Sequence, residues 1–124
     1  MAATTTLHRK DWRTVLDEMN EEHKGKLVTI EVLDSSIGHQ YEAERLPFSS
    51  IGYDPKDDTV IISVGGNSPR YPVVLRHMVP HPREIEVTSS DAAEPAVRLV
   101  DRDGSVTLVT FYPVHYPAPS GKGS

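Results

Sequence analysis

The chain has 124 residues, 37% of them hydrophobic and 25% charged, and it carries a formal net charge of -5 at pH 7; this size suits one domain with a single core. It contains no cysteine, which excludes disulfides, thiolate nucleophiles, iron–sulfur clusters and zinc sites built on sulfur. The 13 Lys and Arg residues form no basic stripe along the sequence, so nucleic acid is not an expected partner.

The first predicted element is a helix that begins near Asp11. Before it, residues 1–6 are small and polar without periodicity, and we expect a disordered N-terminus there. From position 12 the apolar residues recur at i, i+3, i+4 and i+7, which places them in one stripe along a helix. They are Trp12, Val15, Leu16 and Met19. Gly25 predicts the helix end, because glycine turns left-handed without steric cost, and the helix dipole would favour His23 as an imidazolium.

Most of the remaining chain has the pattern of short strands. The stretches "KLVTIEVL", from Lys26, and "TVIISVGG", from Thr59, alternate aliphatic and polar residues, as strands with one buried face do. Between them, "QYEAERL" predicts a strand that bends and reaches "GYD", and "DPKDD" predicts a turn. "YPVVLR" and "EIEVTS" are shorter candidates. The pair Asp103-Gly104 lies between two β-branched runs and predicts a hairpin.

These elements predict a mainly β fold with about six to eight short strands. Consecutive strands without helices between them favour a small antiparallel barrel or a rolled sheet, similar in element order to SH3-like and Sm-like barrels and capped by one N-terminal helix. We expect a single domain over residues 7–112. Residues 113–124 are rich in proline and small residues and predict an extended or disordered tail.

The stretch "LRHMVPHPREIEV" contains the candidate for a metal or small-ligand site, because His77 and His81 lie four positions apart in it. On a helix this spacing would place both rings on one face, but Pro80 and Pro82 exclude a regular helix there. A third ligand is not indicated by spacing. The sequence therefore favours two loop histidines between strands, with a site for a divalent metal or small ligand formed by histidine and carboxylate as the alternative.

The same segment is the best candidate for a binding surface. Arginine, aromatic, methionine and histidine side chains occur together there on a stretch stiffened by prolines, a composition found in protein interfaces. The candidate residues are Arg70, Tyr71, Arg76, His77, Met78 and His81. A structural crossover between strands is the simpler explanation of the same segment.

With these residues in view, the chain resembles an uncharacterised family of short bacterial proteins, known only as a domain of unknown function. The resemblance rests on "W..VLDEMNEEHKGKLVTIEVL", "GHQYEAERLPFSSIGYD", "LRHMVPHPREIEV" and the closing "DGSVTLVTF". It implies no activity and no cofactor. It implies a shared framework at Trp12, His23, Gly25, Leu46-Pro47, Gly52, His77 and Pro82.

The sequence nominates no catalytic residue and no cofactor, and an enzyme is unsupported. We expect a small non-catalytic interaction or structural module that binds a protein partner or a second copy of itself through a strand edge. No apolar run approaches the ~20 residues that cross a membrane, so no membrane association is expected. The N-terminus lacks the apolar segment of a secretory signal, and a cytoplasmic location is predicted by default.

Overall fold

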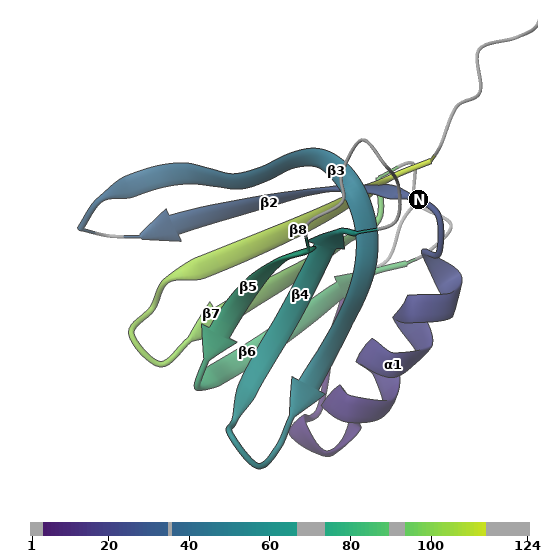
Figure 1. Cartoon of the computed structure of the whole chain (residues 1–124). Coiled ribbons are helices and arrows are strands. Elements are labelled where there is room, and N and C mark those ends of the chain that lie inside the picture. The colour runs from purple at the N-terminus through teal and green to yellow at the C-terminus, as the bar shows by residue number, and fades with distance from the viewer. Residues whose placement is uncertain (1–3, 35, 67–73, 90–93, 114–124) are drawn as a thin grey trace, which may run out of the picture.

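A computed structural model describes residues 4–34, 36–66, 74–89 and 94–113 of the chain. Within these ranges the protein has one α-helix, one short 3-10 helix and eight strands (Figure 1). In chain order they are β1 (Thr4–Thr6), η1 (Arg9–Asp11), α1 (Trp12–Glu22), β2 (Leu27–Asp34), β3 (Gly38–Asp54), β4 (Thr59–Gly65), β5 (Val74–Pro80), β6 (Pro82–Thr88), β7 (Ala96–Asp101) and β8 (Val106–Tyr112).

All described strands belong to one antiparallel sheet with the order β1-β6-β7-β8-β2-β3-β4-β5. The expectation of a mainly β, antiparallel fold with an N-terminal helix is confirmed. The closed-barrel alternative is wrong, because β1 and β5 remain as the two ends of the strand order. Strand β5 continues directly into β6, but β6 already pairs with β1 on one side and β7 on the other. It has no free edge to offer β5.

Strand β3 forms the corner of the sheet, and Figure 1 shows its strong bend. Its first part, through Pro47, pairs with β2, and its second part, from Phe48, pairs with β4. Register shifts accompany both pairings, and Arg45 within the bend has a left-handed φ of 49°. Bulges of this kind bend and twist a strand. The predicted bent strand that reaches "GYD" is therefore confirmed as one 17-residue strand.

Helix α1 closes the core beside the second part of β3. The predicted apolar stripe is confirmed, with Trp12, Leu16 and Met19 buried against aliphatic side chains of the sheet. Asn20 on the same helix accepts a hydrogen bond from the Ile51 N–H at 2.8 Å and donates one to the Ile51 carbonyl at 2.9 Å. The Asn20 amide thus occupies the edge of β3 opposite β4, where a neighbouring strand would otherwise pair.

Turn signals in the sequence match the observed turns. The Asp54 carboxylate accepts hydrogen bonds from the backbone amides of Lys56 and Asp57, which forms the "DPKDD" turn between β3 and β4. Gly104 has a φ of 87° in the predicted hairpin between β7 and β8. Gly25 has a φ of 83° just after α1, so both glycines are used where a left-handed conformation is required.

The N-terminus differs from its prediction. Residues Thr4–Thr6, expected to be disordered, form β1 and pair with β6 over Thr88 to Glu86. Strand pairing uses backbone groups, so three exposed threonines can extend a sheet without any apolar pattern. In the predicted tail, residues 114–124 lie outside the described residues.

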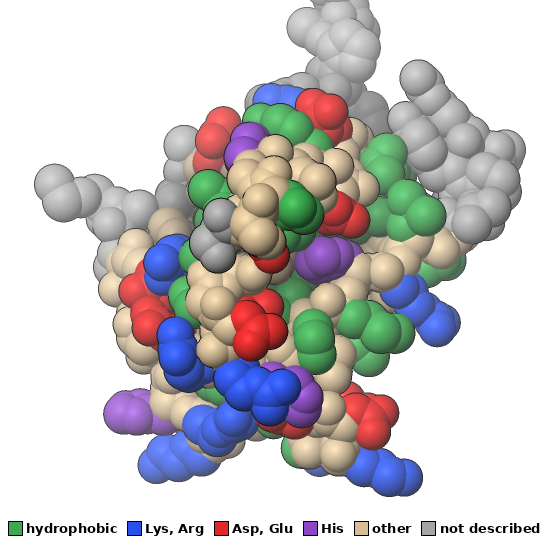
Figure 2. Space-filling model, turned by 90° about the vertical axis from the view of Figure 1, so that its left-hand side faces the viewer, with side chains coloured by type: hydrophobic (Ala, Val, Ile, Leu, Met, Phe, Trp, Pro, Cys, Tyr) green, Lys and Arg blue, Asp and Glu red, His purple; other side chains and the backbone are tan. Residues whose placement is uncertain are grey.

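Some large hydrophobic side chains remain exposed, and Figure 2 shows such side chains lying among charged ones on the face that it displays. Among the described residues they are Leu33, Ile37, Tyr41, Val74, Leu75 and Met78, and the last three belong to the edge strand β5. Among the described residues, no helix is long and apolar enough to cross a membrane.

Candidate functional site

The described part of the predicted binding segment lies in strand β5 and in the corner that follows it. His77, expected in a loop, lies within β5, which pairs with β4 over all seven of its residues. The sequence pattern failed here because the prolines suggested a loop, whereas Pro80 stands at the end of an edge strand, where its missing N–H has no cost. His81 alone separates β5 from β6. Of the predicted residues, Arg70 and Tyr71 lie outside the described residues.

Strand alternation divides the remaining predicted residues between two faces of the sheet. Arg76 and Met78 lie on the outer face, and Met78 is 55% exposed. His77 lies on the opposite face, as does Val79, which is buried in the core. Arg76 and His77 line one common hollow, whereas Met78 and His81 each line a different one.

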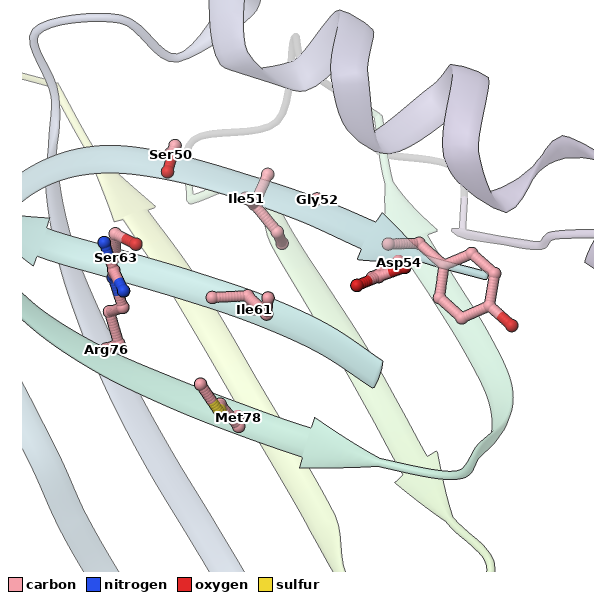
Figure 3. A pocket seen from close by; sticks show the side chains of 9 residues that line it. Ser50, Ile51, Gly52, Asp54, Ile61, Ser63, Arg76 and Met78 are labelled. Atoms are coloured by element: carbon pink, nitrogen blue, oxygen red, sulfur yellow. The ribbon is translucent and has the colours of Figure 1, made fainter. Parts of the chain in front are cut away.

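The first hollow lies on the outer face of β3, β4 and β5, and we call it the outer-face hollow (Figure 3). Two rows of paired residues floor it: Ser50, Ser63 and Arg76 form one row, and Gly52, Ile61 and Met78 form the other. Its volume is about 370 Å³. Gly52 carries no side chain at this face, and nothing lies within 4 Å of where a Cβ would be, so the glycine leaves open space there.

The second hollow, the inner hollow, lies between β5 and the first part of β3. It has a volume of about 130 Å³, and His77 and Glu42 line it together with Arg76 and aliphatic residues. His77 Nδ1 is 4.0 Å from Glu42 Oε1, and the His77 side chain is 20% exposed. Burial lowers the pKa of His77, and the charge of Glu42 opposes that shift. At neutral pH the ring is therefore a neutral, partly buried group.

The third hollow, the corner hollow, surrounds His81 where β5 passes into β6. Its volume is about 310 Å³. His81 Nδ1 lies 3.3 Å from Asp58 Oδ2, and the backbone N–H of His81 donates to the Asp58 carbonyl at 2.7 Å. The residues that line it are Arg9, Asp58, His81, Pro82, Arg83 and Arg102.

His77 and His81 thus occupy separate hollows, each with its own carboxylate, and they do not form a joint site. Within residues 4–34, 36–66, 74–89 and 94–113, no three side chains of His, Asp or Glu gather closely enough to hold a metal ion. The i, i+4 spacing brings two rings together only on a helix, and here a strand and a corner separate them.

His23 caps the C-terminus of α1 as expected, but its charge state differs from the expected one. It does follow the last residue of α1, but its ring is buried and stacks on Phe111, with ring centroids 4.0 Å apart. Lys26 Nζ lies 3.0 Å from His23 Nδ1. Burial, followed by the charge of Lys26, lowers the pKa of His23 to about 4. The expected imidazolium is therefore wrong: the ring is neutral at physiological pH and belongs to the core.

Sequence reasoning missed most of the corner hollow. Arg9, Asp58 and Arg102 lie far from one another along the chain, and only the strand order brings their segments together at His81. Arg83 directly follows the "PHP" stretch, but an isolated arginine beside a proline is no recognisable motif. The one usable signal was the departure of "DPKDDT" and "VPHPR" from regular alternation, which marks chain corners rather than ligands.

The fold and the three hollows define a small, helix-covered antiparallel β protein in which histidines and carboxylates form separate pairs. The chain belongs to the family of unknown function DUF5335, whose model matches residues 3–118. This confirms the resemblance to a family of unknown function. The chain is also similar to an uncharacterized protein of the bacterium Aquifex aeolicus (strain VF5), at 29% identity over 111 residues, 90% of this chain and 94% of that protein. No solved structure matches the chain significantly.

Proposed function

We propose that the protein is a non-catalytic interaction module that binds a second copy of itself through strand β5. The observation that carries this proposal is that β5 lies at the end of the strand order and exposes apolar side chains. Strand β5 is an end of the strand order, and Val74, Leu75 and Met78 on it are 44%, 51% and 55% exposed. Unpaired backbone groups beside exposed apolar side chains favour pairing with another strand.

The edge strand β5 has two of the features that protect sheet edges, the charged Arg76 and the terminal Pro80, but it lacks the others. Protected edges are commonly very short, carry charged residues, lysine above all, or proline, or contain a bulge that twists them away. Strand β5 has seven residues, no lysine, and a regular register with β4 from Val74 to Pro80. Strand β1 at the other end has three polar residues only. The two ends of the sheet therefore differ, and only β5 presents a long apolar edge.

A two-fold antiparallel pairing of β5 with its copy has one favoured register. Centring the axis on His77 pairs all seven residues, from Val74 opposite Pro80 onward, and places Arg76 beside Met78 of the second copy. Centring it on Arg76 would instead oppose two arginines, and like charges directly opposite one another destabilise a strand pair. We therefore favour the His77-centred register, which also puts both outer-face hollows on the same side of the joined sheet.

The separation of the candidate chemical groups supports the non-catalytic part of the proposal. General acid–base or nucleophilic catalysis needs its groups within hydrogen-bond reach of one another or of a shared substrate atom. His77 and His81 line different hollows, and the outer-face hollow beside β5 is lined by serine, aliphatic, methionine and arginine side chains, with Tyr53 and Asp54 at one end. Such a lining suits contact with a partner surface.

Light scattering coupled to size-exclusion chromatography over a range of concentrations tests the proposal. The wild-type chain is expected to show a concentration-dependent dimer. Met78→Glu places a carboxylate beside Arg76 of the second copy and should tighten the dimer, whereas Met78→Lys should weaken it. Two symmetric charge pairs at ~0.5 kcal/mol each correspond to roughly a fivefold change in the dissociation constant in each direction.

The same substitutions at Ile37, which is 63% exposed away from β5, provide the matched control and should leave the dimer unchanged. A monomer at every concentration would refute self-association. Equal effects of Met78→Glu and Met78→Lys would refute the His77-centred register. Circular dichroism of each variant establishes that the fold is retained.

A further inference from the structure

The corner hollow at His81 has a charged lining that takes no part in the proposed pairing through β5. It lies where four segments meet: η1, the turn before β4, the link from β5 to β6, and the turn between β7 and β8. Its lining contains three guanidinium groups, one imidazole and one carboxylate. This is a concentration of positive charge on a chain whose formal net charge is -5.

The backbone of the corner is held in place by hydrogen bonds between these segments. The His81 N–H donates to the Asp58 carbonyl at 2.7 Å, and the Arg102 N–H donates to the His81 carbonyl at 2.9 Å. Asp58 and His81 have left-handed φ values of 50° and 51°. Such conformations cost free energy in residues other than glycine and persist only where the surrounding structure imposes them. The walls of the hollow are therefore preformed.

The carboxylate of Asp58 is occupied by its neighbours. Tyr53 donates its hydroxyl to Asp58 Oδ1 at 2.7 Å, Arg9 Nη1 lies 3.4 Å from the same oxygen, and His81 faces Oδ2. The hydrogen bond from Tyr53, opposed by partial desolvation and supported by His81 and Arg9, lowers the pKa of Asp58. The ionised carboxylate thus holds Tyr53, Arg9 and His81 around it.

The guanidinium of Arg9 is oriented before any ligand arrives. It lies over the ring of Trp12, 4.4 Å from the ring centroid, and Nη2 is 3.4 Å from the carbonyl oxygen of Pro82. Nη1 lies 3.3 Å from the Tyr53 hydroxyl. Stacking on an aromatic face and several acceptors hold a planar guanidinium in one direction. An oriented arginine loses little entropy when it binds a further group.

Arg83 and Arg102 have no ion-pair partner among the residues that the structure describes. Two carboxylates in nearby turns, Asp54 and Asp101, accept hydrogen bonds from amides of their own turns. Two more, Asp57 and Asp103, are exposed at these turns and do not line the hollow. Three guanidinium charges against the one carboxylate of Asp58 therefore leave the hollow with an excess of positive charge.

We propose that the corner hollow binds the phosphate group of a small phosphorylated ligand through Arg9, Arg83 and Arg102. The guanidinium groups of Arg83 and Arg102 each present a fork of N–H donors that matches two oxygens of an oxyanion. Arg9 adds its positive charge, because its Nη1 and Nη2 already lie near Tyr53, Asp58 and Pro82. A carboxylate has two oxygens in one plane and suits a single fork, whereas a phosphate group presents three or more oxygens in tetrahedral directions. Several arginines from separate segments fit the second arrangement. Figure 2 shows Lys and Arg side chains gathered around a histidine at the lower end of the molecule.

Titration with pyrophosphate, followed by calorimetry and by amide NMR shifts, tests this site. The amide signals of His81, Arg83 and Arg102 are expected to move together. Arg83→Gln and Arg102→Gln should each weaken binding roughly tenfold, the effect of losing one charge-assisted hydrogen-bonding group. Lys24→Gln removes one positive charge at the far end of α1 and should bind as the wild type does. Affinity should fall as salt is added, because the site is open to solvent.

Absence of binding in low salt would overturn the proposal, as would equal weakening by Lys24→Gln and the two arginine variants. Citrate serves as the carboxylate arm, and tighter binding of citrate than of pyrophosphate would overturn the assignment to phosphate. The outcome is independent of dimerisation, since Met78→Lys, which is designed to weaken the dimer, should leave pyrophosphate binding unchanged.

Discussion

Helix α1 and edge strand β5 both carry several large apolar side chains, but most of those on the helix are buried and most of those on the strand are exposed. Trp12, Leu16 and Met19 are buried in the core. Val74, Leu75 and Met78 are each more than two-fifths exposed. The helix lies against the bent strand β3, and the described part of the chain places no strand beside the outer edge of β5. Apolar side chains in a segment therefore predict a surface that favours burial. The strand order decides whether another element of the same chain packs against that surface.

The largest expected difference between these two regions is in the loss of unfolding free energy when a leucine of each is replaced by alanine. Leu16→Ala should reduce the free energy of unfolding by about 3 kcal/mol, because it removes a fully buried side chain and leaves a cavity. Leu75→Ala should cost less than about 1 kcal/mol, because half of that side chain is already exposed. Urea denaturation of both variants measures the difference. Similar losses would mean that β5 is covered in solution, and a concentration-dependent loss for Leu75→Ala would identify the second copy as that cover.

An intermediate effect concerns how the free energy of unfolding depends on pH through His23, which is buried at the end of α1. The folded-state pKa of His23 is about 4, below its value of 6.5 in the unfolded chain. Between these values the unfolded state binds the extra proton, so the stability contributed by the neutral ring is complete above pH 6.5 and is lost as the pH falls towards 4. We expect a loss of about 2 kcal/mol between pH 7 and pH 5.

Comparing the pH dependence of unfolding for the wild type and His23→Gln isolates this contribution. The variant should lose stability less steeply over the same interval. His8→Gln, which removes an exposed ring outside the core, is the matched control. Parallel curves for wild type and His23→Gln would contradict a buried neutral ring stacked on Phe111.

The smallest of these effects concerns how α1 is fixed to the sheet. Asn20→Ala leaves the Ile51 N–H and carbonyl without their side-chain partner. Because Asn20 is only half-buried, water can reach part of this site, and we expect a cost of about 1 kcal/mol. Glu18→Ala on the exposed side of α1 should change stability little. Hydrogen exchange at the Ile51 amide gives a second readout, and unchanged protection in Asn20→Ala would refute this role.

Sequence patterns predicted the elements that depend on local periodicity. The stripe at Trp12, Leu16 and Met19, the alternation in β2 and β4, and the hairpin at Gly104 are all properties of neighbours within one segment. The prediction failed for β1 and was incomplete for β5, because the candidate strand "YPVVLR" ended at Arg76. Strand β1 pairs with backbone groups of the distant β6, and the prolines at the end of β5 resembled loop signals.

The sequence by itself determined that the chain has a Trp-containing amphipathic helix followed by antiparallel strands, because side-chain spacing alone fixes which face of each element is apolar. Only the tertiary structure decided that the sheet stays open at β5, that His23 is neutral, and that His77 and His81 occupy different hollows. It also assembled Arg9, Asp58, His81 and Arg102 at one corner. These features depend on which segments meet in space, and spacing along the chain carries no information about that.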